Sequence, residues 1–163
     1  MTHVISLLVE NHQGVMARIA GLFSGRGYNM ESFTAGATLD PTVTRITLVC
    51  RGDNTVIDQI TKQLNRLIDV IKVYEFTGRR TLDRELALIK VFLKPEKRAE
   101  IFQIADVFGA DVMDLGRDAM VLELTGSSQK IDDLVALLQD FGIQEIARSG
   151  LVSMERAKKS KNG

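Results

Sequence analysis

Hydrophobic and polar positions along the chain follow two periods, which predict strands and helices in a repeating order. The first apolar run, Val4 to Val9, has the length of a buried strand. A polar stretch from Glu10 to Gly14 interrupts it, and apolar residues then recur at helical spacing up to Phe23. Gly25-Arg26-Gly27 ends this predicted helix, because glycine is favoured just beyond a helix C-terminus. Tyr28-Asn29 opens the next strand.

The rest of the first half completes a known order of elements. A strand is predicted from Asn29 to about Thr38, followed by a turn at Asp40-Pro41-Thr42 and a β-branched strand from Val43 to Arg51. A second helix follows, and a fourth strand runs from Val70 to Thr77. The resulting order, β-α-β-β-α-β, is the ferredoxin-like plan. The apolar face of that second helix consists of Val56, Ile57, Ile60, Leu64, Leu67 and Ile68.

The second half repeats the same order after a polar linker, Gly78 to Thr81. The predicted elements are a strand at Glu85 to Leu93, a helix opened by Pro95, a hairpin around Gly116-Arg117-Asp118, a helix capped by Ser127 or Ser128, and a strand at Ile143 to Arg148. We therefore predict an α+β fold of two tandem ferredoxin-like βαββαβ domains, with antiparallel sheets and helices on one face. The expected domains are residues 4–78 and 79–157, and the charged tail 158–163 is expected to be disordered.

The strands are apolar on both faces, although this plan leaves one sheet face without helices. In the first strand Ile5, Leu7 and Val9 point one way, and Val4 and Leu8 point the other. The strands at 45–49 and 86–93 share this pattern. An exposed apolar face is an interface that lacks its partner, so we expect self-association or docking on another protein.

Composition and charge exclude several classes of function. Lys plus Arg and Asp plus Glu both number 21, so no net charge attracts nucleic acid or an acidic membrane surface. The central strand Val43 to Cys50 has no aromatic residue, which argues against an RNA-recognition module. Cys50 is the single cysteine, so an internal disulfide is impossible and a reducing compartment is expected. Without a signal-like or membrane-length apolar run, we expect a cytoplasmic protein.

Residues with catalytic or metal-binding chemistry are few and scattered. His3 and His12 flank a strand, and neither has a cysteine or second histidine at ligand spacing, so no metal site is expected. His12 is interpreted as a solvent-facing loop residue, and Cys50 as a core residue. Asp132-Asp133 lies in the first turn of a predicted helix, where negative charge favours the helix dipole.

The loop before the first helix is the candidate ligand site. A short loop that leads into a helix offers unpaired backbone N–H groups and the positive end of the helix dipole, which suits a small anion or carboxylate. Asn11 adds a donor and an acceptor, and Gly14 allows close approach of a ligand.

The alternative interpretation is that the same loop is part of an enzyme active site. Gln13-Gly14-Val15-Met16-Ala17-Arg18 shares four of five defined positions with the acylphosphatase turn Gln-Gly-Val-x-Phe-Arg, in which Arg18 would bind the oxyanion. The phenylalanine position holds Ala17, and the next central strand has no asparagine to position a water. An acylphosphatase would also leave the second half of the chain without a role.

Three stretches carry a resemblance to a known family. They are Ser6-Leu7-Leu8-Val9-Glu10-Asn11, Gly14-Val15-Met16-Ala17-Arg18-Ile19-Ala20-Gly21-Leu22-Phe23 and Arg26-Gly27-Tyr28-Asn29-Met30-Glu31-Ser32. Together they resemble an ACT domain, and more closely the regulatory small subunit of acetohydroxyacid synthase (acetolactate synthase). Ala147-Arg148-Ser149-Gly150, followed by Met154 and Arg156, is similar to the same family, so the resemblance spans the whole chain.

The resemblance implies a regulatory role without a catalytic site. The family stimulates a separate catalytic large subunit, which uses thiamine diphosphate, magnesium and FAD, and it confers feedback inhibition by a branched-chain amino acid, most often valine. Its ACT domains pair as a homodimer and hold the effector between the loop of one copy and the start of the second strand of its partner. Gln13 stands where many ACT domains have proline. The residues at the matching places are Asn11, Gly14, Val15, Met16, Asn29 and Met30.

Overall fold

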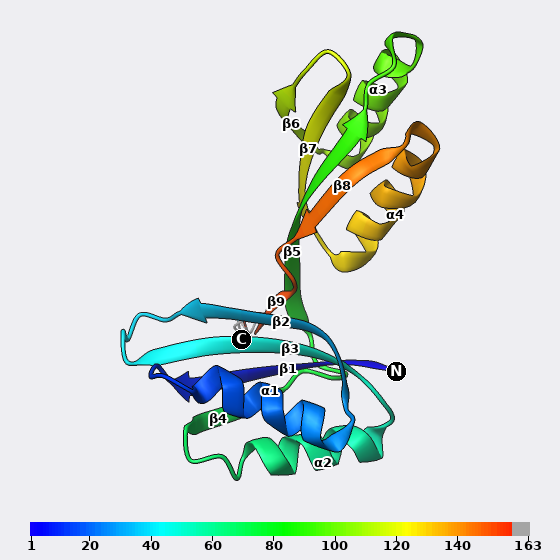
Figure 1. Cartoon of the computed structure of the whole chain (residues 1–163). Coiled ribbons are helices and arrows are strands. Elements are labelled where there is room, and N and C mark those ends of the chain that lie inside the picture. Colours follow the sequence, from blue (N-terminus) through cyan, green and yellow to red (C-terminus); the bar gives the residue numbers. More distant parts are fainter. Residues whose placement is uncertain (158–163) are drawn as a thin grey trace, which may run out of the picture. The chain divides into compact units, whose positions relative to one another are not determined.

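The computed structural model describes residues 1–157, and their contacts divide the chain into two compact units (Figure 1). The first unit contains residues 1–82 together with the described residues from Leu151 onward, and the second contains residues 83–150. The expected second domain ended at residue 157, whereas the last described stretch groups with the first unit. The predicted disordered tail, 158–163, lies outside the described residues.

The first unit is an antiparallel sheet with strand order β2-β3-β1-β4. Its two helices lie against the same face of this sheet (Figure 1). This order confirms the ferredoxin-like plan predicted from the sequence. The elements are β1 (Thr2–Glu10), α1 (Val15–Arg26), β2 (Asn29–Ala37), β3 (Val43–Arg51), α2 (Asn54–Leu64) and β4 (Val70–Glu75).

Alternation along β1 decides which side chains form the core of this unit. Ile5, Leu7 and Val9 are fully buried between sheet and helices, as the period-2 pattern predicts. The opposite face carries Val4 and Leu8, which are only partly buried. The rest of the buried core cluster is Val15, Ile19, Phe23, Ile46, Leu48, Cys50, Ile57, Ile60 and Leu64.

The second helix is shorter than its apolar pattern predicts. α2 ends at Leu64, and Asn65 follows as the C-cap, with its Nδ2 donating to the carbonyl of Thr61 at 2.9 Å. The chain must then turn back to pair β4 with β1, so the helical spacing that includes Ile68 does not continue. Ile68 was predicted on the apolar helix face, but it is 88% exposed, so that part of the prediction is wrong.

The second unit has the same architecture, with strand order β6-β7-β5-β8. Its core lies between this sheet and its two α-helices, and Ala87, Ile89 and Val91 supply the buried face of the central strand. The elements are β5 (Thr81–Phe92), a 3₁₀ turn (Pro95–Lys97), α3 (Arg98–Phe108), β6 (Asp111–Leu115), β7 (Ala119–Gly126), α4 (Ser128–Leu138), a second 3₁₀ turn (Gln139–Phe141) and β8 (Ile143–Arg148).

A short last strand, β9 (Val152–Glu155), was not predicted. It pairs with β5 and lies close to the central strand β1 of the first unit. Because β1 is flanked by β3 and β4, and the helices occupy one face, β9 lies over the other face. Leu151 and Ser153 are buried there, and the N–H of Leu151 donates to the hydroxyl of Ser32 at 3.3 Å. Part of the apolar face that the sequence assigned to a partner is therefore covered by the chain itself.

The helices of the described chain are short. α1, with 12 residues, is about 18 Å long at 1.5 Å per residue. Within residues 1–157, none of the helices combines the length and the apolar character that a membrane span requires.

Candidate functional site

The loop between β1 and α1 is held against the turn that joins β2 to β3. The backbone N–H of Asn11 donates to the carbonyl of Thr42 at 2.7 Å, and its Nδ2 donates to the carbonyl of Pro41 at 3.0 Å. These two bonds fix the orientation of the Asn11 side chain. Its Oδ1 remains as the acceptor that a ligand amine could use.

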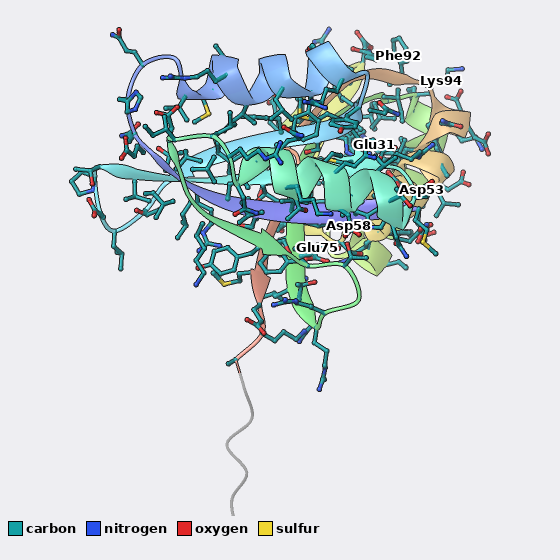
Figure 2. The ribbon with its side chains drawn as sticks, turned by 90° about the horizontal axis from the view of Figure 1, so that it is seen from below. Glu31, Asp53, Asp58, Glu75, Phe92 and Lys94 are labelled. Atoms are coloured by element: carbon teal, nitrogen blue, oxygen red, sulfur yellow. The ribbon has the colours of Figure 1, made fainter. Side chains whose placement is uncertain are left out.

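Gly14 begins α1 in a conformation that favours glycine. Its φ is +88°, in the left-handed region, and it offers no side-chain cap to the helix. By contrast, Asp53 lies at the start of α2 (Figure 2), and its carboxylate accepts from the N–H of Val56. The Ser127 hydroxyl accepts from the N–H of Lys130 at the start of α4. The first-turn N–H groups of α1 are thus left for water or for a ligand with negative charge.

The two apolar residues that follow Gly14 have different environments. The side chain of Val15 is 1% exposed and belongs to the core, so Val15 can offer a ligand only its backbone N–H. Met16 is 36% exposed at the first turn of α1. Its flexible thioether can contact an apolar ligand group near the loop.

The predicted site residues form two groups that one chain does not bring together. Asn29 and Met30 begin β2, opposite Arg51 and the buried Cys50 of β3. The candidate loop follows Glu10, which pairs with the other end of β3 at Val43. The length of α1, about 18 Å, separates the two groups. Asn11, Gly14 and Met16 therefore lie near each other, whereas Asn29 and Met30 lie at the far end of the same unit.

A surface cavity of about 280 Å³ adjoins the loop and approaches the size of a small-molecule site. Asn11 is the predicted site residue in its wall. The lining residues are Glu10, Asn11, His12, Thr42, Val43 and Ile71.

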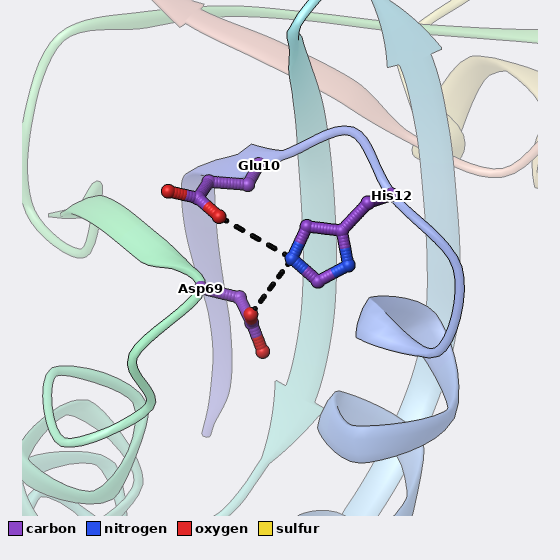
Figure 3. Close-up of side chains that lie close together, drawn as sticks. All are labelled: Glu10, His12 and Asp69. Atoms are coloured by element: carbon purple, nitrogen blue, oxygen red, sulfur yellow. Dashed lines mark ion pairs between the residues drawn. The ribbon is translucent and has the colours of Figure 1, made fainter.

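A charged cluster beside this cavity was not predicted from the sequence (Figure 3). The Nε2 atom of His12 lies 2.9 Å from Oδ1 of Asp69 and 3.3 Å from Oε2 of Glu10. Asp69 is 5% exposed, and its other oxygen accepts from Nε of Arg18 at 3.0 Å. The Asp69 carbonyl also accepts from the N–H of Glu10 at 2.9 Å, which fixes the aspartate beside the end of β1. Asp69 is far from His12 in sequence, and only the pairing of β4 with β1 brings the two together.

The surroundings of His12 raise the pKa of its imidazole. The largest cause is the hydrogen bond to the carbonyl of Gln13, and the attraction of Asp69 and Glu10 adds to it, while desolvation opposes both. His12 was predicted to be a solvent-facing loop residue. Its side chain is 45% exposed, but its ring is fixed by ionic and hydrogen-bonded partners.

Arg18, which would bind the oxyanion in an acylphosphatase, is paired with a carboxylate. Its Nε donates to Asp69, and this competes with binding of a phosphoryl group. Cys50 is fully buried, and desolvation raises the pKa of its thiol to about 12, which confirms its interpretation as a core residue.

The fold and the loop define a class of protein: the first unit has the architecture of an ACT domain, and the second is a further ferredoxin-like unit. Two family models match and together cover almost the entire chain. An "AHAS small subunit-like ACT domain" matches residues 5–72, and "Small subunit of acetolactate synthase" matches residues 84–157. The chain belongs to the acetolactate synthase small subunit family.

Relatives of known name agree with this assignment. The acetolactate synthase small subunit of Bacillus subtilis is 47% identical over 163 residues, which cover 99% of this chain and 94% of the relative. That of Mycobacterium bovis is 44% identical over 155 residues, covering 95% and 92%. The crystal structure of the small subunit from Thermotoga maritima superposes with a TM-score of 0.89 at 37% identity, and it covers 98% of this chain and 99% of its own.

Proposed function

We propose that this chain binds the catalytic large subunit of acetolactate synthase, stimulates it and makes it sensitive to feedback inhibition by valine. Valine binds between the first units of two copies of the chain. The proposal rests on membership of the small subunit family and on the division of the predicted effector residues into two distant groups.

The division of the site is the observation that carries the proposal. The loop with Asn11 and Gly14 and the strand start with Asn29 and Met30 lie at opposite ends of α1. At about 1.5 Å per residue, the 12 residues of α1 span about 18 Å. A ligand the size of valine therefore cannot reach both ends of α1 within one chain. A second copy in antiparallel orientation supplies the missing half from outside, so two such sites form in a symmetric dimer.

The chemistry of the loop suits a free amino acid. The carboxylate of valine accepts from the uncapped N–H groups that follow Gly14, at the positive end of α1. Oδ1 of Asn11 accepts from the ammonium group, since Nδ2 is already bonded to Pro41. Met16 of one copy and Met30 of the other contact the branched side chain.

The catalytic step belongs to the partner. Thiamine diphosphate, magnesium and FAD are assigned to the large subunit, which joins pyruvate to a second 2-keto acid. The contribution of this chain is a coupling free energy between the valine site and the distant catalytic site, of about 1–3 kcal/mol for a typical allosteric pair. Valine alters the pairing of the two copies and thereby the fit to the large subunit.

The test is isothermal titration of the whole chain with L-valine, with Asn11→Ala and Asn29→Ala as variants. Loss of one charge-assisted hydrogen bond should weaken binding by about 10- to 150-fold, or about 1.5–3 kcal/mol. Gln129→Ala is the matched control, because Gln129 is an exposed amide of the second unit that bonds only Asp133 on its own helix.

Mixing the two asparagine variants makes the test specific for a shared site. Each mixed dimer regains one intact site, in which Asn11 and Asn29 come from different copies, so half of the heterodimer sites should bind valine. Unchanged affinity in both single variants would contradict the effector site. Acetolactate formation by the large subunit, measured with and without this chain, tests stimulation separately.

A further inference from the structure

The cluster of Glu10, His12 and Asp69 has the composition and geometry of a metal site. The three residues come from the end of β1, the following loop and the turn before β4. One ligand atom from each lies within 4.8 Å of the other two. In Figure 3 both carboxylates point at the same imidazole nitrogen, Nε2.

The tautomer of His12 is determined by its other nitrogen. Nδ1 lies 3.0 Å from the carbonyl oxygen of Gln13, which can only accept, so Nδ1 carries a proton. Nε2 then faces two carboxylates that also only accept. A bare lone pair there would be repelled, so a cation must lie between the three groups, either a proton on Nε2 or a metal ion.

The distances agree with a metal ion. Two ligands bound at about 2.0–2.1 Å lie about 3.4 Å apart at a tetrahedral angle and about 2.9 Å apart at a right angle. The observed separations from Nε2, 2.9 Å to Asp69 and 3.3 Å to Glu10, lie within this range. The separation to Glu10 is that of a tetrahedral ion, and the separation to Asp69 would have to lengthen by about 0.5 Å to match it.

The groups around the ligands are those that orient metal-binding side chains. A ligating histidine usually donates its other N–H to a carbonyl or carboxylate, as His12 does to Gln13. Arg18 holds Oδ2 of Asp69 and leaves Oδ1 directed at His12. His3, in contrast, is buried and has both ring nitrogens beside protein groups, the Thr77 hydroxyl and the Gly52 carbonyl.

We propose that Glu10, His12 and Asp69 bind one zinc ion, or a similar divalent transition-metal ion, beside the effector loop. One imidazole favours a transition metal over magnesium or calcium, which prefer oxygen ligands. Three protein ligands leave a coordination position open to water, because Glu10 and His12 are half exposed. A bound ion would fix His12, which lies between Asn11 and Gln13 in the loop. An effect of the ion on valine binding rests on the proposed function, but the metal site itself does not.

The experiment is titration of the metal-free whole chain with zinc, followed by calorimetry and by the NMR shift of His12 Nε2. We expect one site per chain, a direct change at Nε2 and no response to magnesium. His12→Gln and Glu10→Gln should each weaken zinc binding by about tenfold or more, since even the loss of a group that only orients a metal ligand has an effect of that size.

The matched control is Glu31→Gln, which removes one carboxylate of the same unit. Glu31 pairs with Arg51 at 2.7 Å and has no part in the cluster, so zinc affinity should not change. Absence of zinc binding, or equal affinity in the wild type and His12→Gln, would overturn the proposal and leave a proton as the cation. Valine titration of the same samples separates the two proposals, because valine binding without zinc binding would refute the metal site alone.

Discussion

The two units are built on one plan, and their first strand-to-helix connections differ. Strand orders β2-β3-β1-β4 and β6-β7-β5-β8 are equivalent. The first helix of each ends at a left-handed glycine, Gly27 with φ +65° and Gly109 with φ +62°. The second helix of each begins with a side-chain cap, Asp53 or Ser127. The two units therefore share their strand order and the residues that end or begin their helices.

The first connection of each unit has a different chemistry. Neither first helix has a side-chain cap, but in the first unit the residue before α1 is Gly14 in the left-handed conformation. In the second unit Pro95 opens a 3₁₀ turn, and Lys97 pairs with Glu100 at 3.0 Å and lies 5.5 Å from the ring centre of Phe141. The two connections therefore differ in a few residues that the shared fold does not require, and the proposed valine site uses only the first of them.

The buried acid of each unit also has a different role. Asp69 bonds Arg18 and His12 beside the loop. Glu85, in contrast, forms a bidentate ion pair with Arg148, with both contacts at 2.8 Å. The second pair ties β5 to β8 and is structural. Asp132 also bonds Arg148, at 2.7 Å, so α4 contributes to the same network. α4 begins at Ser128 and has no acidic residue in its first turn, so the prediction that placed Asp132 and Asp133 there is wrong.

The largest expected effect separates the stabilities of the two units. Ile89→Ala removes a fully buried side chain from the centre of β5 and should destabilise the second unit by about 2–5 kcal/mol. Leu7→Ala is the matched change in β1. Hydrogen exchange should report lost protection in the mutated unit, and valine should still bind Ile89→Ala. Equal loss in both units would show that they unfold as one.

The next effect tests the difference between the two connections. Gly14→Asp places a carboxylate where the effector carboxylate binds, at a φ of +88° that strains any side chain. Valine binding should weaken by more than the roughly 150-fold upper limit expected for one lost charged hydrogen bond. Lys94→Asp, at the matching connection of the second unit, should leave valine affinity unchanged in the same titration. An effect of similar size from Lys94→Asp would contradict a single ligand loop.

A smaller effect concerns acid stability of the second unit. Hydrogen bonding to Arg148, the largest cause, lowers the pKa of Glu85 below its usual 4.5, and the bond from Ser128 adds to this. The pair therefore stabilises the fold fully above about pH 4.5, and this contribution is lost as the pH falls through the lowered pKa. Glu85→Gln should unfold more easily at pH 7 and should show a weaker acid dependence in denaturant titrations. An unchanged acid slope would indicate that other carboxylates control it.

The smallest effect tests the equivalence of the second helices. Asp53→Ala and Ser127→Ala each remove the cap of one helix and should cost about 0.5–2 kcal/mol in denaturant unfolding. Similar costs would support equivalent roles, and a much larger value for one would show that its cap has a further function. Valine binding should persist in both variants.

Much of this architecture could be predicted from the order of residues alone. Period-2 and helical spacing identified the four strands and two helices of each half, because burial on one face imposes those periods. Helix ends were also predictable: Gly27 and Ser127 act through their own backbone or side chain. The strand Val43 to Arg51 was predicted with its observed bounds.

Other features were decided only by tertiary structure, because they depend on residues that are far apart in sequence. Pairing of β4 with β1 places Asp69 beside His12, and no local pattern in the loop contains that contact. The position of β9 over the first sheet depends on the whole sheet being formed. The helix α1, about 18 Å long at about 1.5 Å per residue, separates Asn11 from Asn29 and so divides the candidate site into two groups. The sequence by itself determined the elements and the loop chemistry, since both act within a few residues, and the packed sheet decided which distant groups meet.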